Sequence, residues 1–121
     1  GKVVIDLKTG SSKPTAAELA VHPQLGAYQV AVEEGAFAAY GRVSAGAGLL
    51  QLGRAATRTI AVDQQRPLAD DDDPGWARRL VEETAEGMAA ASFRASPGTH
   101  CGTCAVATSC PVGPDGKGAR L

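Results

Sequence analysis

The sequence predicts a mixed α/β (α+β) domain that ends in a cysteine-rich tail. Residues 2–7 ("KVVIDL") are a short β-branched apolar run, which is typical of a buried strand. Helical spacing of apolar residues marks segments 24–37 and 73–91, and two segments that read as strands, 48–54 and 58–65, lie between them. A strand, a helix, two strands and a helix in this order predict a mixed central sheet flanked by helices.

Composition limits the class of protein. The chain has 121 residues, enough for one modest domain with a core, and 44% of them are hydrophobic. The net charge of −1 gives no global positive field for coating nucleic acid, but it does not exclude an enzyme that meets DNA at one metal site. No apolar run reaches the roughly 18 residues of a membrane span, so no membrane partner is expected.

The first helical segments carry their own start signals. Thr15 and Glu18 have the spacing of a capping box before a short helical turn that begins at "AAEL". Pro23 suits the first turn of a second helix, and His22 is read as the residue beside that helix start. Apolar positions at helical spacing continue this helix through Leu25, Tyr28, Val32 and Ala36.

The second half of the chain predicts a hairpin and a helix. Residues 40–48 ("YGRVSAGAG") read as a glycine-rich connection, and the runs 48–54 and 58–65 follow as two strands with a short polar turn between them. Residues 67–74 ("PLADDDDP") read as a solvated acidic loop, in which Asp73 can cap the last helix. One stripe of that helix is expected to be core: Trp76, Leu80, Val81, Ala85 and Met88.

Asp6 and Lys8 lie two residues apart at the end of the first strand, so their side chains point to the same face. A carboxylate there can bind Mg²⁺ or Mn²⁺, and an ammonium can approach the same substrate. Phosphodiester hydrolysis uses such a set, because the metal neutralises phosphate charge and the lysine stabilises charge as it develops. The alternative is an ordinary strand end with a surface ion pair.

Gln24 and Tyr28 lie four residues apart on the second predicted helix and therefore share one face. An amide and a phenol so arranged can hydrogen-bond to phosphates or bases, and the aromatic group can stack on a base. The alternative is a helix with one buried tyrosine and one solvated glutamine. A strand that ends in Asp-x-Lys-x-Gly, followed by a helix with Gln-x-x-x-Tyr, is a rarer combination than either pair.

The segment "VVIDLKTG", followed by "HPQLGAYQ", resembles RecB-like nucleases of the PD-(D/E)XK superfamily. It is similar in particular to nuclease domains fused to UvrD-like helicases in actinobacterial recombination and repair proteins. The resemblance covers residues 3–111 and implies a partial restriction-endonuclease-like core over residues 1–96. It implies a Mg²⁺- or Mn²⁺-dependent DNA exonuclease that works with a helicase motor in the same chain or complex.

The resemblance also implies roles for single residues. Asp6 would bind the metal, Lys8 would be the catalytic lysine, and the backbone carbonyl of Leu7 would complete the metal site. Gln24 and Tyr28 would lie near the DNA.

In one respect the sequence departs from the family pattern. The family places a helix histidine and a second metal-binding aspartate upstream of the Asp-x-Lys strand, and His22 follows that strand. The acidic run 70–73 has the wrong place and context to replace the aspartate. The chain is therefore expected to be a piece of a larger nuclease or helicase–nuclease, with an incomplete metal site and little activity by itself.

Cys101, Cys104 and Cys110 have the spacing C-x2-C-x5-C. Three clustered cysteines are a poor disulfide framework and a better metal or cluster set, which favours a reducing, cytoplasmic setting. Unrelated thiols are the alternative. Several RecB-like nucleases hold a [4Fe–4S] cluster with three such cysteines and one far upstream, so the resemblance implies a cluster-binding tail over residues 97–121. That site would be absent or incomplete in this chain, zinc is the alternative metal, and the last residues are expected to be disordered.

Two other functions remain open at this point. One is a degenerate nuclease fold that holds DNA or a partner subunit without cutting, against which the intact Asp6–Lys8 and Gln24–Tyr28 pairs argue. The other is a small zinc-binding interaction domain, in which the tail is functional and "DLKTG" is incidental.

Overall fold

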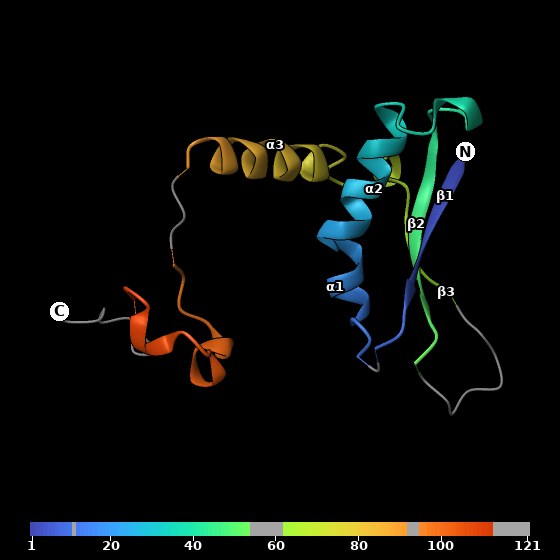
Figure 1. Cartoon of the computed structure of the whole chain (residues 1–121). Helices are drawn as coiled ribbons and strands as arrows, with labels where there is room; N and C mark the ends of the chain where they lie inside the picture. Colours follow the sequence, from blue (N-terminus) through green and yellow to red (C-terminus); the bar gives the residue numbers. More distant parts are fainter. Residues whose placement is uncertain (11, 54–61, 92–94, 113–121) are drawn as a thin grey trace. The chain divides into compact units, whose positions relative to one another are not determined.

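The computed structural model describes residues 1–10, 12–53, 62–91 and 95–112. The chain divides into two units, Gly1–Thr84 and Ala85–Leu121, which are described separately. The elements of regular structure (Figure 1) are β1 (Lys2–Lys8), α1 (Ala16–Ala20), α2 (Pro23–Glu33), η1 (Ala38–Tyr40), β2 (Ser44–Gln51), β3 (Val62–Gln65), η2 (Leu68–Asp70), α3 (Trp76–Ala89), η3 (Thr99–Thr103) and η4 (Ala107–Ser109).

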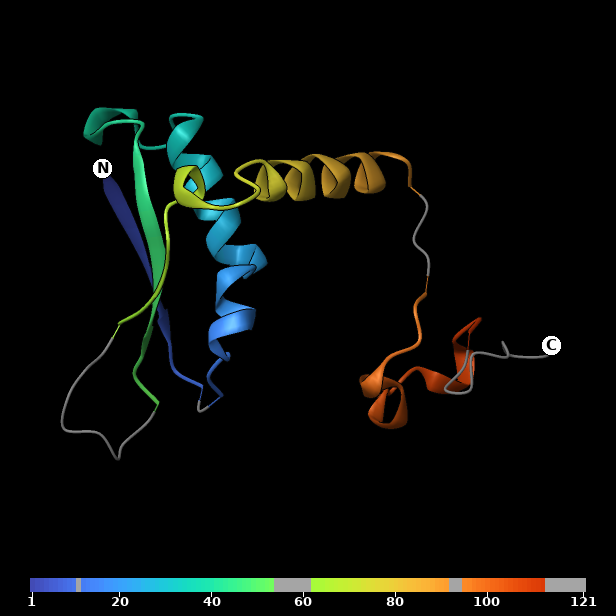
Figure 2. The same cartoon turned by 180° about the vertical axis from the view of Figure 1, so that it is seen from behind.

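The three strands form the mixed sheet that the sequence predicts, and their order in it is β1–β2–β3. β1 pairs with β2 in parallel, with Asp6 opposite Leu49 and Lys8 opposite Gln51. β2 pairs with β3 in antiparallel, with Leu49 opposite Asp63. A parallel pair needs a crossover connection, and α1 and α2 supply it on one face of the sheet (Figures 1 and 2).

β2 begins earlier than the sequence suggests. The predicted strand starts at residue 48, whereas β2 already starts at Ser44, inside the segment read as a glycine-rich connection. The small residues there allow close packing: a Cβ atom on Gly48 would lie 2.6 Å from Cγ1 of Val62. The other predicted strand, 58–65, appears as β3 (Val62–Gln65), and residues 58–61 lie outside the described residues.

The first two helices start where the sequence predicts. The capping box of α1 is present, since the backbone N–H of Thr15 donates to Oε2 of Glu18 at 2.7 Å and the N–H of Glu18 donates to Oγ1 of Thr15 at 3.3 Å. α2 has Pro23 in its first turn and His22 as its N-cap residue. The predicted continuation to residue 37 is wrong, because Gly35 takes a φ of 87° that a right-handed helix does not allow.

The core of the first unit has two clusters. Leu25, Ala47 and Leu49 are buried between α2 and β2, and Val4, Leu19 and Tyr28 pack against them. Each fully buried leucine contributes about 1.5–3 kcal/mol relative to an exposed one. The second cluster contains Val30, Leu68 and Ala77, with Trp76 packed against it. Gly26 permits this contact, because a Cβ atom there would lie 2.6 Å from the indole of Trp76.

The predicted core stripe of the last helix is wrong in its second half. α3 begins at Trp76 rather than at Asp73, and its buried residue is Ala77. Met88 is 68% exposed, and Val81 and Ala85 are exposed as well, because only the first turn of α3 meets the second core cluster. Among the described helices, none combines the length and the apolar composition that a membrane span requires.

Candidate active site

β1 presents Asp6 and Lys8 on the helix-covered face of the sheet. Val4, Asp6 and Lys8 are half-buried, whereas the alternate residues Ile5 and Leu7 are exposed. The period of two along a strand produces this separation, so the predicted shared face of Asp6 and Lys8 is confirmed.

α2 brings Gln24 and Tyr28 to the same place. Nζ of Lys8 lies 2.6 Å from Oδ2 of Asp6 and donates a hydrogen bond of 2.8 Å to Oε1 of Gln24. Nε2 of Gln24 donates to the hydroxyl of Tyr28 at 2.6 Å, and that hydroxyl donates to Oδ1 of Asp6 at 3.3 Å. The two pairs that the sequence singles out thus form one closed group, called the quartet below.

The quartet is partly shielded from water. The side chains of Asp6 and Lys8 are 19% and 35% exposed, so solvent weakens their attraction less than that of a surface pair. Oδ2 of Asp6 is buried, and its partner among the described residues is the Lys8 ammonium at 2.6 Å. A half-buried carboxylate that already pairs with one cation can hold a hard cation such as Mg²⁺ in place of that ammonium.

Asp6 is the acidic member of the quartet. Within the described residues, no group of three or more His, Cys, Asp or Glu side chains gathers as a metal site. Mg²⁺ commonly keeps several waters and takes one or two carboxylates plus substrate phosphate oxygens. Asp6 therefore fits a magnesium site of that kind as one ligand, and the role of the Leu7 carbonyl stays a prediction.

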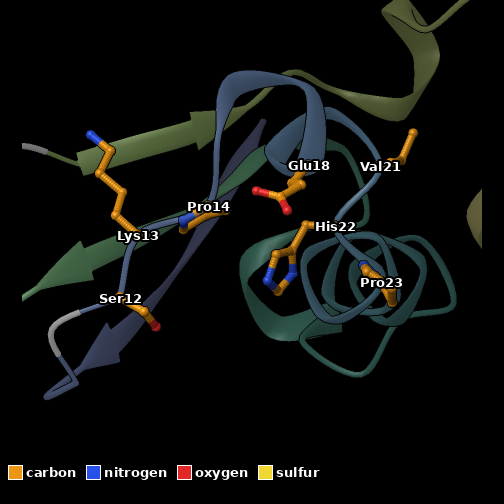
Figure 3. A pocket seen from close by; sticks show the side chains of 7 residues that line it. All are labelled: Ser12, Lys13, Pro14, Glu18, Val21, His22 and Pro23. Carbon is orange, nitrogen blue, oxygen red and sulfur yellow. The ribbon is translucent and has the colours of Figure 1, made fainter. Parts of the chain in front are cut away.

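A pocket of about 560 Å³ lies at the junction between α1 and the start of α2 (Figure 3). Ser12, Glu18 and His22 are among its lining residues. His22 makes no side-chain capping hydrogen bond, and its Nδ1 is buried with no partner among the described residues. Its predicted place beside a helix start is confirmed.

The three cysteines belong to the second unit and are described apart from the quartet. Cys101 lies in η3, Cys104 follows η3, and Cys110 follows η4; all are free thiols. In the described structure they do not gather as a metal-binding group, so a bound metal would require them to move together. Residues 113–121, for which the sequence predicts disorder, lie outside the described residues.

Sequence reasoning missed two buried polar residues, Gln29 and Gln65. Gln29 lies one helical turn after Leu25, on the apolar side of α2. A glutamine at an apolar position of a helix was the available signal for a buried amide with specific partners.

The protein-family model described as the PD-(D/E)XK nuclease superfamily matches residues 1–111. The match includes every residue of the quartet and all three cysteines. Neither a curated protein nor a solved structure matches the chain.

Proposed function

The chain belongs to the PD-(D/E)XK nuclease superfamily, and from this premise we propose that it is the nuclease domain of a metal-dependent DNA exonuclease. Members of the superfamily are generally hydrolases that cut nucleic acid, with DNA as the expected substrate. The observation that supports the proposal is the quartet, in which a carboxylate, an ammonium, an amide and a phenol come together at the end of one strand.

In the proposed reaction, water attacks the phosphorus atom of a phosphodiester, the bond to the leaving oxygen breaks, and a proton passes from the water to solvent or to the leaving oxygen. Lys8 orients the attacking water or stabilises the negative charge that develops on the phosphate oxygens. Gln24 and Tyr28 can exchange their bonds within the quartet for bonds to the DNA strand. The group therefore has to open partly when substrate binds.

Asp6 would hold the divalent cation, which when bound places positive charge beside the phosphate. The place of Asp6 in the quartet, with its side chain only 19% exposed, supports this role. The Lys8 ammonium occupies the neighbourhood of Oδ2 of this carboxylate, so metal binding and the Asp6–Lys8 ion pair compete for the same atom. We therefore propose that Lys8, once released from Asp6, would turn toward the substrate and place its ammonium near the phosphate.

The finer assignment is to the RecB-like group, with a helicase motor in the same chain or complex and a role in recombination and repair. Its support is the pairing of "VVIDLKTG" with "HPQLGAYQ" and the C-x2-C-x5-C spacing downstream. We propose residues 1–96 as nuclease core and 97–121 as a tail that binds a [4Fe–4S] cluster or zinc. The tail would be structural and takes no part in the reaction.

The rival function of a non-cleaving DNA-binding module predicts DNA binding without degradation. The rival function of a zinc-binding interaction domain predicts zinc-dependent folding and no effect of Asp6→Ala on DNA degradation.

The decisive experiment compares Mg²⁺-dependent degradation of linear DNA by the full-length protein and its Lys8→Ala variant. Loss of one charge-stabilising donor is expected to lower the rate about 100-fold or more. Lys13→Ala is the matched control, because Lys13 forms an ion pair with Asp63 at 2.6 Å and lies outside the quartet. Equal rates for wild type and Lys8→Ala refute the catalytic assignment, and DNA binding without degradation by the wild type favours the non-cleaving module.

A further inference from the structure

Two glutamines are buried in the first unit without any part in the quartet. Gln29 on α2 is 0% exposed and Gln65 at the end of β3 is 3% exposed. An uncharged amide in a protein interior lowers stability unless its hydrogen bonds are satisfied. The partners of these two side chains therefore indicate what they do.

Gln65 holds the junction between α1 and α2. Its Nε2 donates to the carbonyl oxygens of Leu19 at 2.9 Å and Ala20 at 3.1 Å. It also lies 3.4 Å from the carbonyl oxygen of His22, two residues before Gln24. The last carbonyls of a helix have no partner within it, so β3 satisfies the end of α1 and fixes where α2 begins.

Gln29 holds the middle of α2. Its Nε2 donates to Oε1 of Gln65 and to the carbonyl oxygen of Arg66, both at 3.0 Å. Its Oε1 accepts from Oγ of Ser44 at 2.9 Å and from the N–H of Leu68 at 3.0 Å. All the donor and acceptor capacity of this amide is thus used, which fixes both its orientation and the helix that carries it.

The backbone is shaped to admit this contact. Gly46 in β2 has a φ of 106°, and a Cβ atom there would lie 2.5 Å from the carbonyl oxygen of Gln65. Glycine at this position lets the end of β3 approach β2 closely and brings Gln65 beneath the helices. A side chain there would be strained by its backbone angle and would push this strand end away.

The quartet depends on the placement of α2 relative to β1. Asp6 and Lys8 come from the sheet, whereas Gln24 and Tyr28 come from α2, between the His22 junction and Gln29. A shift of one ångström would lengthen the 2.6–3.3 Å contacts of the quartet beyond hydrogen-bonding range. Displacements of that size can cost an enzyme about 100-fold in rate.

We propose that Gln29 and Gln65, the glutamine clamp, are positioning residues that hold α2 so that Gln24 and Tyr28 meet Asp6 and Lys8 in working geometry. The inference rests on the proposed nuclease function. The clamp acts through Gln24 and Tyr28, and it touches neither substrate nor metal.

The test uses Gln65→Met in the full-length protein, because methionine keeps the volume and removes the donors. The control is Val30→Ala on the same helix, which removes buried methyl groups and leaves every clamp hydrogen bond in place. Thermal midpoints of both variants are measured first, and DNA degradation is then assayed well below the lower midpoint. Ser44→Ala removes a single donor to Gln29 and serves as the milder variant if Gln65→Met does not fold.

We expect Gln65→Met to lower kcat about 10- to 100-fold, with a much smaller effect of Val30→Ala. In a Gln24→Ala, Tyr28→Phe background, adding Gln65→Met is expected to change kcat little, because the residues through which it acts are gone. The proposal is overturned if Gln65→Met and Val30→Ala lower kcat equally at equal thermal midpoints. It is also overturned if Gln65→Met lowers kcat as much in the Gln24→Ala, Tyr28→Phe background as in the wild type.

A measurement independent of activity separates this inference from the proposed function. Hydrogen exchange of the backbone amides of His22 and Gly26, which bond to the carbonyls of Leu19 and His22, is expected to quicken in Gln65→Met and not in Val30→Ala. Unchanged exchange refutes the clamp. A wild-type protein without nuclease activity counts against the proposed function, and the exchange result still decides whether the clamp holds the junction.

Discussion

At the scale of single residues, the hydrogen bonds of the quartet all run from donor to acceptor in one order. The Lys8 ammonium donates to the Gln24 amide, that amide donates to the Tyr28 hydroxyl, and the hydroxyl donates to Asp6. Asp6 thus accepts the hydrogen bond of the Tyr28 hydroxyl on Oδ1 and pairs with the Lys8 ammonium through Oδ2. The amide of Gln24 has one favourable orientation, because its oxygen has to face the Lys8 ammonium and its nitrogen the Tyr28 hydroxyl.

Tyr28→Phe tests this arrangement, because it removes the hydroxyl and keeps the aromatic group that packs on the first core cluster. We expect the free energy of unfolding to fall by about 1 kcal/mol and DNA degradation by about tenfold. Chemical denaturation and a nuclease assay measure the two effects. Tyr40→Phe is the control, since Tyr40 is 71% exposed, and equal nuclease rates for the two variants would contradict a role for the Tyr28 hydroxyl.

The two pairs within the quartet were predictable from the sequence, whereas the contact between the two pairs was not. Spacing alone places Asp6 with Lys8 on one strand face and Gln24 with Tyr28 on one helix face. The alignment of α2 along β1 depends on contacts between distant segments, such as the hydrogen bond between Gln29 and Gln65. No local pattern encodes such a contact.

At the scale of elements, α1 and β2 show opposite outcomes of sequence reasoning. α1 is a short helix whose capping box is local in sequence, so Thr15 and Glu18 predicted its start. The start of β2 was missed, because Gly46 and Gly48 look like loop residues unless their neighbours in space are known.

The capping box predicts a dependence of stability on pH. The backbone N–H of Thr15, and then its hydroxyl, hold the pKa of Glu18 below its ordinary value of 4.5. A lowered pKa in the folded state means that Glu18 stabilises the fold above pH 4.5 and that this contribution is lost as pH falls through the folded-state pKa. Thermal midpoints of wild type and Glu18→Gln, measured across this range, are expected to converge at low pH. A constant difference between the two midpoints would show that the charge of Glu18 does not matter.

At the scale of the whole molecule, the two faces of the sheet differ. α1 and α2 lie over the face that carries the quartet (Figures 1 and 2). The opposite face exposes Ile5, Leu7 and Val62 in the described structure. The fold class was predictable from the order of elements, whereas the prediction of a buried first strand is wrong, because helices cover only one face of β1 and leave Ile5 and Leu7 exposed.

The tail gives a prediction about metal content. Its three thiols are free and not gathered, so they have to move together to hold a metal. We expect the full-length protein, purified without oxygen, to contain iron and sulfide, and Cys104→Ser to lower both. Elemental analysis with a sulfide assay measures them. Stoichiometric zinc without iron would replace the cluster with a zinc site, and the absence of both metals would leave three unrelated thiols.

The quartet also has a consequence for the order of folding. Its most distant members are separated by 22 residues, whereas Gln65 reaches back 45 and 46 residues to the carbonyls of Ala20 and Leu19. Closing the 22-residue loop between Asp6 and Tyr28 loses less chain entropy than closing the loops to Gln65, so the segment from β1 to α2 can assemble before β3 joins the sheet. Pulse-labelled refolding should then protect the amides of α2 before those of β3, and the reverse order would exclude this route. The chemical groups would come together early, and their final alignment would wait for the last strand.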